Sequence, residues 1–109
     1  MVPRRSLIAT LALASLPGLA LAQAFPQRSI TLVVPFPAGG ITDQISRAMA
    51  QKMGETLGQP VIVDNKPGGG GQIAAGTVKQ APADGHTLFV GATEMFAINQ
   101  NLFRKFSYD

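Results

Sequence analysis

Three short runs of apolar and β-branched residues lie at residues 29–34, 61–63 and 87–90. They are followed by Pro35, Asp64 and Gly91, residues that favour turns over regular structure. Short continuous apolar runs of this kind are typical of strands that are buried on both faces, and such strands occur mainly in parallel sheets. The pattern therefore predicts three strands of one parallel sheet.

The segments between and after these strands have helical spacing. Thr42 and Asp43 are candidate N-caps of a first helix, which Gly58 and Pro60 end. Its apolar residues recur three and four positions apart, which stacks them on one side: Ile45, Ala48, Met49, Met53 and Leu57. Residues 72–80 predict a second helix with one stripe made of Ile73, Ala74, Thr77 and Val78. Residues 95–103 predict a third helix.

The alternation of strand and helix indicates an α/β fold, a parallel open sheet with flanking helices. Right-handed crossovers place the first strand between the other two. The three loops that follow the strands then share one edge of the sheet. Ligands of open α/β sheets bind outside the carboxyl ends of the strands where the strand order reverses. This places the candidate site at residues 38–43 and 92–95.

Residues 1–22 have the features of a secretory signal peptide. Arg4 and Arg5 precede an apolar stretch at residues 7–16, and the dipeptide Pro17-Gly18 interrupts it. The stretch is about half as long as the roughly 20 residues that a membrane span needs. Cleavage after Ala22 and cleavage after Ala24 fit equally, and export can follow the Sec or the twin-arginine route.

Composition changes the picture once this leader is set aside. The 109 residues carry a net charge of +3, but two of the nine basic residues belong to the leader. Residues 23–109 therefore carry seven basic against six acidic residues, scattered singly. Nucleic-acid binding needs a basic stripe, so no nucleic-acid partner is expected. The length allows one domain at most, and a chain without cysteine has no disulfide framework.

The residues predict neither a catalytic nor a metal centre. His86 is the single histidine and stands beside a turn, where a structural or exposed role is expected. The carboxylates occur singly, without the spacing of an acid and base pair, and no Gly-x-Ser-x-Gly motif is present. We therefore expect no enzyme activity, no catalytic residues, no metal and no cofactor.

The glycine run at residues 68–71 allows two interpretations. With Ala74 it formally matches a dinucleotide-binding pattern, which would make the chain a fragment of a nucleotide-binding α/β enzyme. Residues 64–67 separate the run from its strand, however, and no acidic residue ends the next strand. The second interpretation is a flexible turn into a helix whose small residues allow close packing. A secreted interaction module without a small ligand is a further alternative for the chain.

The loop after the first strand contains the pair Gly39 and Gly40, which leave their amides open to close approach. The helix that begins near Thr42 adds free N–H groups and positive potential. A carboxylate bound there would receive two or three hydrogen bonds of about 1.5–3 kcal/mol each. The physical pattern alone leaves open whether the two glycines form this anion site or only turn the chain.

Four motifs closely resemble the Bug-type periplasmic solute-binding proteins of tripartite tricarboxylate transporters. They are LVVPFPAGG at residues 32–40 followed by Thr42 and Asp43, LGQPVIVDNKPG at 57–68, ADGHTL at 83–88 and AIN at 97–99. The resemblance implies a two-lobed periplasmic binding protein that captures a small carboxylate, an organic acid or an amino acid, and delivers it to a membrane permease. It also implies that residues 23–109 are the N-terminal part of lobe 1, without the second lobe, and enter the periplasm without inserting into the membrane.

The resemblance assigns ligand contacts to amides of the first loop and to two further segments. The residues implied are Phe36, Ala38, Gly39, Gly40, Thr42, Gln72, Ala92, Thr93 and Glu94. Glu94 departs from the family pattern. Its carboxylate would repel a di- or tricarboxylate, so it favours an amino acid or an aromatic monocarboxylate.

Overall fold

The computed structural model describes residue 22 and residues 24–105, and these form a three-stranded parallel sheet with helices around it. The strands are β1 (Ile30–Val34), β2 (Val61–Asn65) and β3 (Thr87–Phe89), in the order β2-β1-β3. Both pairings of β1 are parallel. The predicted strand order and parallel pairing are thereby confirmed, but β2 continues through Asp64 and Asn65, where the sequence predicts the start of the next loop. The predicted leader lies outside the described residues, except for Ala22.

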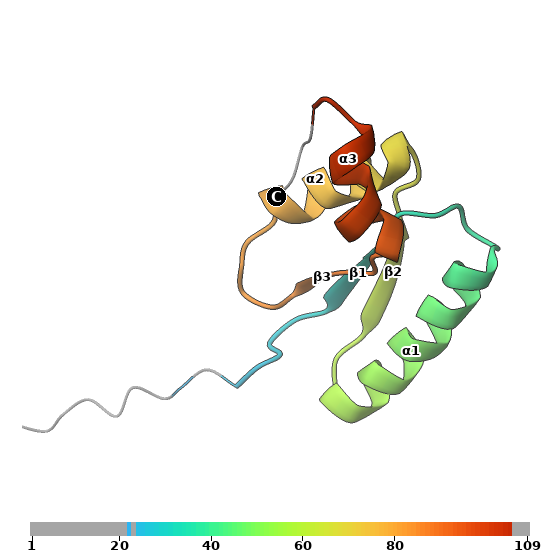
Figure 1. The fold of residues 1–109 in the computed structure, drawn as a ribbon. Helices are drawn as coiled ribbons and strands as arrows, with labels where there is room; N and C mark the ends of the chain where they lie inside the picture. Colours follow the sequence, from blue (N-terminus) through green and yellow to red (C-terminus); the bar gives the residue numbers. More distant parts are fainter. Residues whose placement is uncertain (1–21, 23, 106–109) are drawn as a thin grey trace, which may run out of the picture.

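Two helices connect the strands and lie on opposite sides of the sheet (Figure 1). They are α1 (Ile41–Leu57), between β1 and β2, and α2 (Gln72–Gln80), between β2 and β3. The crossover from β1 to β2 and the crossover from β2 to β3 run across the sheet in opposite directions, and right-handed connections that do so place their helices on opposite faces. The single-turn helix η1 (Gly69–Gly71) precedes α2.

The core forms around β1, whose Leu32 and Val34 pack with Ala50 of α1. Partly buried apolar side chains surround this cluster: Phe36, Val61, Val63, Leu88 and Val90. β1 is buried on both faces, as its sequence predicts. β2 is not fully buried, which corrects that prediction, because it is an edge strand of the described sheet and its Ile62 is exposed.

The face of α1 that is buried differs from its apolar stripe. Asp43, Ser46 and Ala50 are the buried residues of the helix. Ile45 and Met49 are about half exposed, at 56% and 49%. Small residues at positions 46 and 50 let the helix lie close to the sheet, and the buried Asp43 is held there by hydrogen bonds. Ile45 and Met49 of the predicted stripe therefore lie on the outer surface of the helix, while Met53 and Leu57 are partly buried.

The start of α1 also corrects the predicted N-caps. Gly40 is the N-cap, and no side chain caps the helix there. Thr42 and Asp43 already belong to the first turn. At the other end, the predicted stop at Gly58 is confirmed: its φ is 71° and its N–H donates to the Gly54 carbonyl over 2.9 Å.

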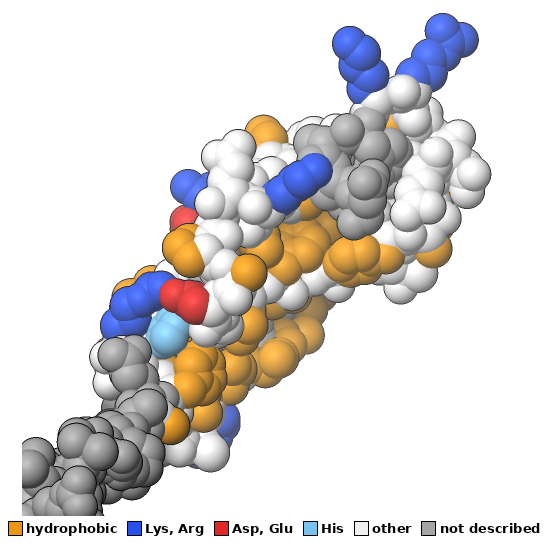
Figure 2. Space-filling view, turned by 90° about the vertical axis from the view of Figure 1, so that its left-hand side faces the viewer, with side chains coloured by type: hydrophobic (Ala, Val, Ile, Leu, Met, Phe, Trp, Pro, Cys, Tyr) orange, Lys and Arg blue, Asp and Glu red, His pale blue; other side chains and the backbone are white. Residues whose placement is uncertain are grey.

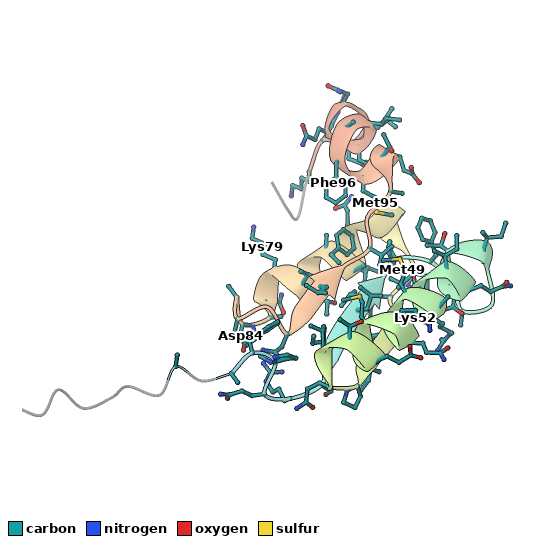
Figure 3. All side chains as sticks on the ribbon, turned by 90° about the horizontal axis from the view of Figure 1, so that it is seen from below. Met49, Lys52, Lys79, Asp84, Met95 and Phe96 are labelled. Atoms are coloured by element: carbon teal, nitrogen blue, oxygen red, sulfur yellow. The ribbon has the colours of Figure 1, made fainter. Side chains whose placement is uncertain are left out.

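The predicted third helix is divided into two short pieces. The π-helix η2 (Glu94–Ile98) is followed by the α-helix α3 (Asn99–Leu102). The wide turn of η2 directs Met95 toward the glycine run and Phe96 toward Phe89 of β3, with ring centroids 5.9 Å apart. Figure 3 shows both side chains between η2 and the strands. These contacts hold the segment against the sheet.

Large apolar side chains are also exposed outside α1. Figure 2 shows hydrophobic side chains gathered across one face of the molecule. Phe96, Ile98, Leu102 and Phe103 of the C-terminal segment are each at least two-fifths exposed. Within residues 24–105, no helix has the length and apolar character that a membrane crossing requires.

Candidate ligand-binding site

The strand register brings the ends of all three strands to one edge of the sheet, which we call the carboxyl edge. Val34, the last residue of β1, is paired with Asn65, the last residue of β2. The Lys66 N–H donates to the Val34 carbonyl over 2.7 Å, and the Val90 N–H donates to the Val33 carbonyl over 2.9 Å. The loops after the three strands therefore leave the sheet side by side, as predicted.

The first loop, residues 35–40, leads directly into α1, and its residues 37–40 are exposed. Within residues 24–105 the N–H groups of Ala38 and Gly40 have no hydrogen-bond acceptor. The first N–H groups of α1 follow at once, and a helix has no internal acceptors for them. The loop thus presents several backbone donors at the positive end of a 17-residue helix.

The amide of Gly39 is used within the protein. Its N–H donates to Asp43 Oδ2 over 2.9 Å. This amide is not available to a ligand, which narrows the predicted set of donors in the loop. Gly39 has a φ of +92°, a conformation that favours glycine, and no other atom lies within 4 Å of the place where a Cβ would be.

Gly40 has an extended backbone, with φ −76° and ψ 174°, which any residue can adopt. A Cβ at this position would meet only the Pro37 carbonyl oxygen, at 3.7 Å, which is ordinary van der Waals contact. Neither conformation nor packing therefore requires glycine here. What glycine provides at residue 40 is open space above the loop amides.

Asp43 is 3% exposed and accepts three hydrogen bonds. Besides the Gly39 N–H, Arg47 Nε donates to its Oδ2 over 3.0 Å and Asn65 Nδ2 donates to its Oδ1 over 3.0 Å. The Arg47 hydrogen bond, and after it those from Gly39 and Asn65, lower the pKa of Asp43 to about 2. The carboxylate is therefore ionised at neutral pH.

Asn65 connects the end of β2 to the same loop. Its Nδ2 also donates to the Phe36 carbonyl over 3.1 Å, and its Oδ1 accepts from Arg47 Nη2 over 3.2 Å. Sequence reasoning missed Asn65 and Arg47 and treated Asp43 as an isolated carboxylate. The four-residue spacing of Asp43 and Arg47 on one helix was a usable signal for their ion pair.

The other predicted residues lie on neighbouring segments of the carboxyl edge. Ala92 is half-buried, while Thr93 and Glu94 are exposed at the start of η2. Gln72 begins α2 directly after the glycine run. A Cβ on Gly71 would lie 2.6 Å from Met95 Sδ, so the glycine run and η2 are in close contact. Gln72 thus lies near the third loop.

The opposite edge of the sheet has a different character. Arg28 Nη2 lies 2.7 Å from Asp84 Oδ2. His86 is buried; its Nε2 accepts from the Gln27 N–H, and its Nδ1 lies 3.3 Å from Asp84 Oδ1. A recess of about 330 Å³ is lined by these residues. His86 therefore has the structural role that its position predicts.

No group of three or more metal-ligating side chains occurs within residues 24–105. The donors at the carboxyl edge are backbone amides and hydroxyls, which suit an anionic oxygen ligand better than a cation.

The comparisons with known proteins decide the family. Residues 45–109 match the model of the tripartite tricarboxylate transporter family receptor. The chain belongs to this family. Its proteins are substrate-binding receptors and not enzymes. A protein encoded between tcbD and tcbE in Pseudomonas sp. strain P51 is 47% identical over 95 residues, which are 84% of this chain and 28% of that protein. The chain thus spans less than a third of that relative.

Solved structures of related receptors share the fold. Rpa4515 of R. palustris with adipate superposes with a TM-score of 0.74 at 42% identity, covering 79% of this chain and 29% of that one. MatC from Rhodopseudomonas palustris with bound malate has a TM-score of 0.58 at 51% identity, covering 62% and 23%. The predicted fold class, a parallel open sheet with flanking helices as in a binding-protein lobe, is confirmed.

Proposed function

We propose that the chain forms part of the first lobe of an extracytoplasmic receptor that captures a small carboxylate and delivers it to a tripartite tricarboxylate-type permease. In this proposal, residues 1–22 are a signal peptide and residues 23–109 act in the periplasm. The observation that carries the proposal is the first loop, where backbone donors without an acceptor in residues 24–105 stand at the N-terminus of α1.

In this proposal the candidate residues contribute to ligand binding in different ways. The N–H groups of Ala38 and Gly40 and the Thr42 hydroxyl donate to the ligand carboxylate, while Phe36 packs beneath the loop on the core. Gly39 contributes its conformation, since Asp43 occupies its amide. Ala92, Thr93, Glu94 and Gln72 approach the ligand from the neighbouring loops.

The ligand class is a small carboxylate, an organic acid or an amino acid. Related receptors hold adipate and malate, both of which are dicarboxylates. Glu94 is exposed at the carboxyl edge, where its charge would oppose a second ligand carboxylate but would pair with a ligand amine. A ligand with an amine or with one carboxylate therefore fits this chain better than a dicarboxylate does.

Native mass spectrometry of the protein purified under non-denaturing conditions tests the proposal directly. The proposal predicts a resident small molecule that carries a carboxylate. Calorimetry with adipate, malate, aspartate and benzoate then ranks the classes, and Glu94→Gln is expected to favour adipate and malate, which carry two carboxylates and no amine. A protein that carries no small molecule and binds none of the four acids would refute the proposal.

A further inference from the structure

Three side chains from separate places hold the first loop, and we call them the loop clamp: Asp43 in the first turn of α1, Arg47 one turn later and Asn65 at the end of β2. Within the clamp, Arg47 bonds both Asp43 and Asn65, at 3.0 and 3.2 Å. Asn65 in turn donates to Asp43 over 3.0 Å. The three side chains thus form a closed triangle of hydrogen bonds.

The clamp grips the first loop at two points. Asn65 Nδ2 donates a hydrogen bond to the carbonyl of Phe36 at the start of the loop, over 3.1 Å. Asp43 Oδ2 accepts a hydrogen bond from the N–H of Gly39 near the end of the loop, over 2.9 Å. Ala38 lies between these two points and Gly40 lies beside the second, and the N–H groups of both have no hydrogen-bond acceptor within residues 24–105. The clamp therefore fixes the backbone around the two free donors without using them.

We infer that Asp43 is a positioning residue for the ligand carboxylate: by holding Gly39, it sets the direction of the Ala38 and Gly40 N–H groups. The inference rests on the proposed function, in which these two groups bind the carboxylate. Asp43 itself does not touch the ligand. Its side chain is buried, and its carboxylate already accepts hydrogen bonds from three donors of the protein.

The chemistry of the clamp requires a carboxylate at residue 43. Gly39, Arg47 and Asn65 all present donors to it, and they approach both of its oxygens. An asparagine has the same shape but replaces one oxygen by an NH₂ group, which would face a donor. Asp43→Asn therefore disrupts the clamp with little change in volume. The low pKa of Asp43 agrees with this donor-rich surrounding.

The experiment compares the full chain with its Asp43→Asn variant by two readouts. Calorimetry uses adipate, malate, aspartate and benzoate as probes, at a temperature far below the midpoint of thermal unfolding of each variant. Hydrogen exchange follows residues 38–40, in which the Gly39 N–H is the amide bonded to Asp43 and therefore the one whose protection reports on the clamp. We expect affinity for the bound probe to fall about tenfold to 100-fold in Asp43→Asn, because small displacements of binding groups have effects of that size. Exchange of the Gly39 amide is expected to accelerate, because its acceptor is lost.

Two further variants make the result specific. Asp64→Asn removes a partly exposed carboxylate near the end of β2 that lies outside the clamp, and it is expected to change neither readout. Asn65→Ala leaves the Asp43 charge but releases the Phe36 carbonyl, and it is expected to weaken binding in the same direction. Asn65→Ala also provides the test if Asp43→Asn does not fold. A purely structural role would lower stability and leave the affinity of the folded protein unchanged.

The outcomes separate the two proposals. If the unsubstituted chain binds a probe and the clamp variants bind it equally well, the inference about Asp43 is wrong and the proposed function stands. If the unsubstituted chain binds none of the probes and carries no resident carboxylate, the proposed function fails and the inference fails with it.

Discussion

The carboxyl edge carries two glycine-rich loops with opposite surroundings. In the first loop, a Cβ on Gly39 would meet no atom within 4 Å, and one on Gly40 would make an ordinary contact. In the run at residues 68–71, every glycine has a positive φ, and a Cβ on Gly71 would collide with Met95. Glycine thus provides open space in the first loop and close packing in the second. Unfilled space beside free donors marks the better candidate for a ligand site.

The largest expected effect on stability comes from Gly71→Ala. The left-handed backbone and the overlap with the buried Met95 are each unfavourable, and together they should lower the free energy of unfolding by about 2–4 kcal/mol. Gly40→Ala is the matched control, with an expected loss of no more than about 1 kcal/mol. Urea denaturation of the full chain measures both. Equal losses for the two variants would contradict the contrast between the loops.

The overlap can be separated from the backbone strain. In a Met95→Ala background the steric part disappears, so Gly71→Ala should then cost only the strain of the left-handed conformation, about 1–2 kcal/mol. A full cost in both backgrounds would mean that Met95 does not restrict residue 71.

A smaller effect on stability is expected at low pH, because protonation of Asp43 weakens the hydrogen bonds that hold the first loop. Its pKa is lowered from 3.8 to about 2, so the native state binds a proton less readily than the unfolded chain. The clamp therefore contributes stability fully above about pH 5, and this contribution is lost as pH falls from about 4 toward 2. The protection of the Gly39 amide against hydrogen exchange, taken relative to the intrinsic rate at each pH, should fall in that range, whereas in Asp43→Asn it should already be low at pH 7.

Asp84 provides the control for this pH dependence. Its pKa is also lowered, first by the His86 N–H and then by Arg28, but it lies at the opposite edge of the sheet. Asp84→Asn should therefore leave the acid response of residues 38–40 unchanged. If the acid response of residues 38–40 disappears in Asp84→Asn instead, the response arises at the opposite edge of the sheet and Asp43 is not its cause.

The sequence predicts the sheet well because its determinants are local and strong. The β-branched residues of β1 and the order of the elements lead to a parallel sheet with β1 in the centre. The buried face of α1 was not predictable from its apolar spacing, since Asp43, Ser46 and Ala50 pack inward while Ile41 is 78% exposed. That orientation depends on contacts between α1 and β2, which periodicity does not contain.

The sequence predicts the position of the candidate site in the fold, but only some of the atoms that are available to a ligand there. Strand order and helix direction point to the first loop, and the glycines support that choice. The capture of the Gly39 amide depends on Asp43 being turned inward, and the contact with Asn65 joins residues 22 positions apart. Such tertiary hydrogen bonds leave no periodic signal in a single sequence.

The most direct test of the account measures carboxylate affinity in Gly40→Asp against Gly40→Asn. Both side chains suit the N-cap position, so both variants should be at least as stable as the unsubstituted chain. Only Gly40→Asp places a negative charge above the loop amides. Calorimetry should show affinity at least about 100-fold weaker for Gly40→Asp, the equivalent of losing two charge-assisted hydrogen bonds, and a much smaller loss for Gly40→Asn. Equal affinities in a stably folded pair would show that the first loop does not hold the carboxylate.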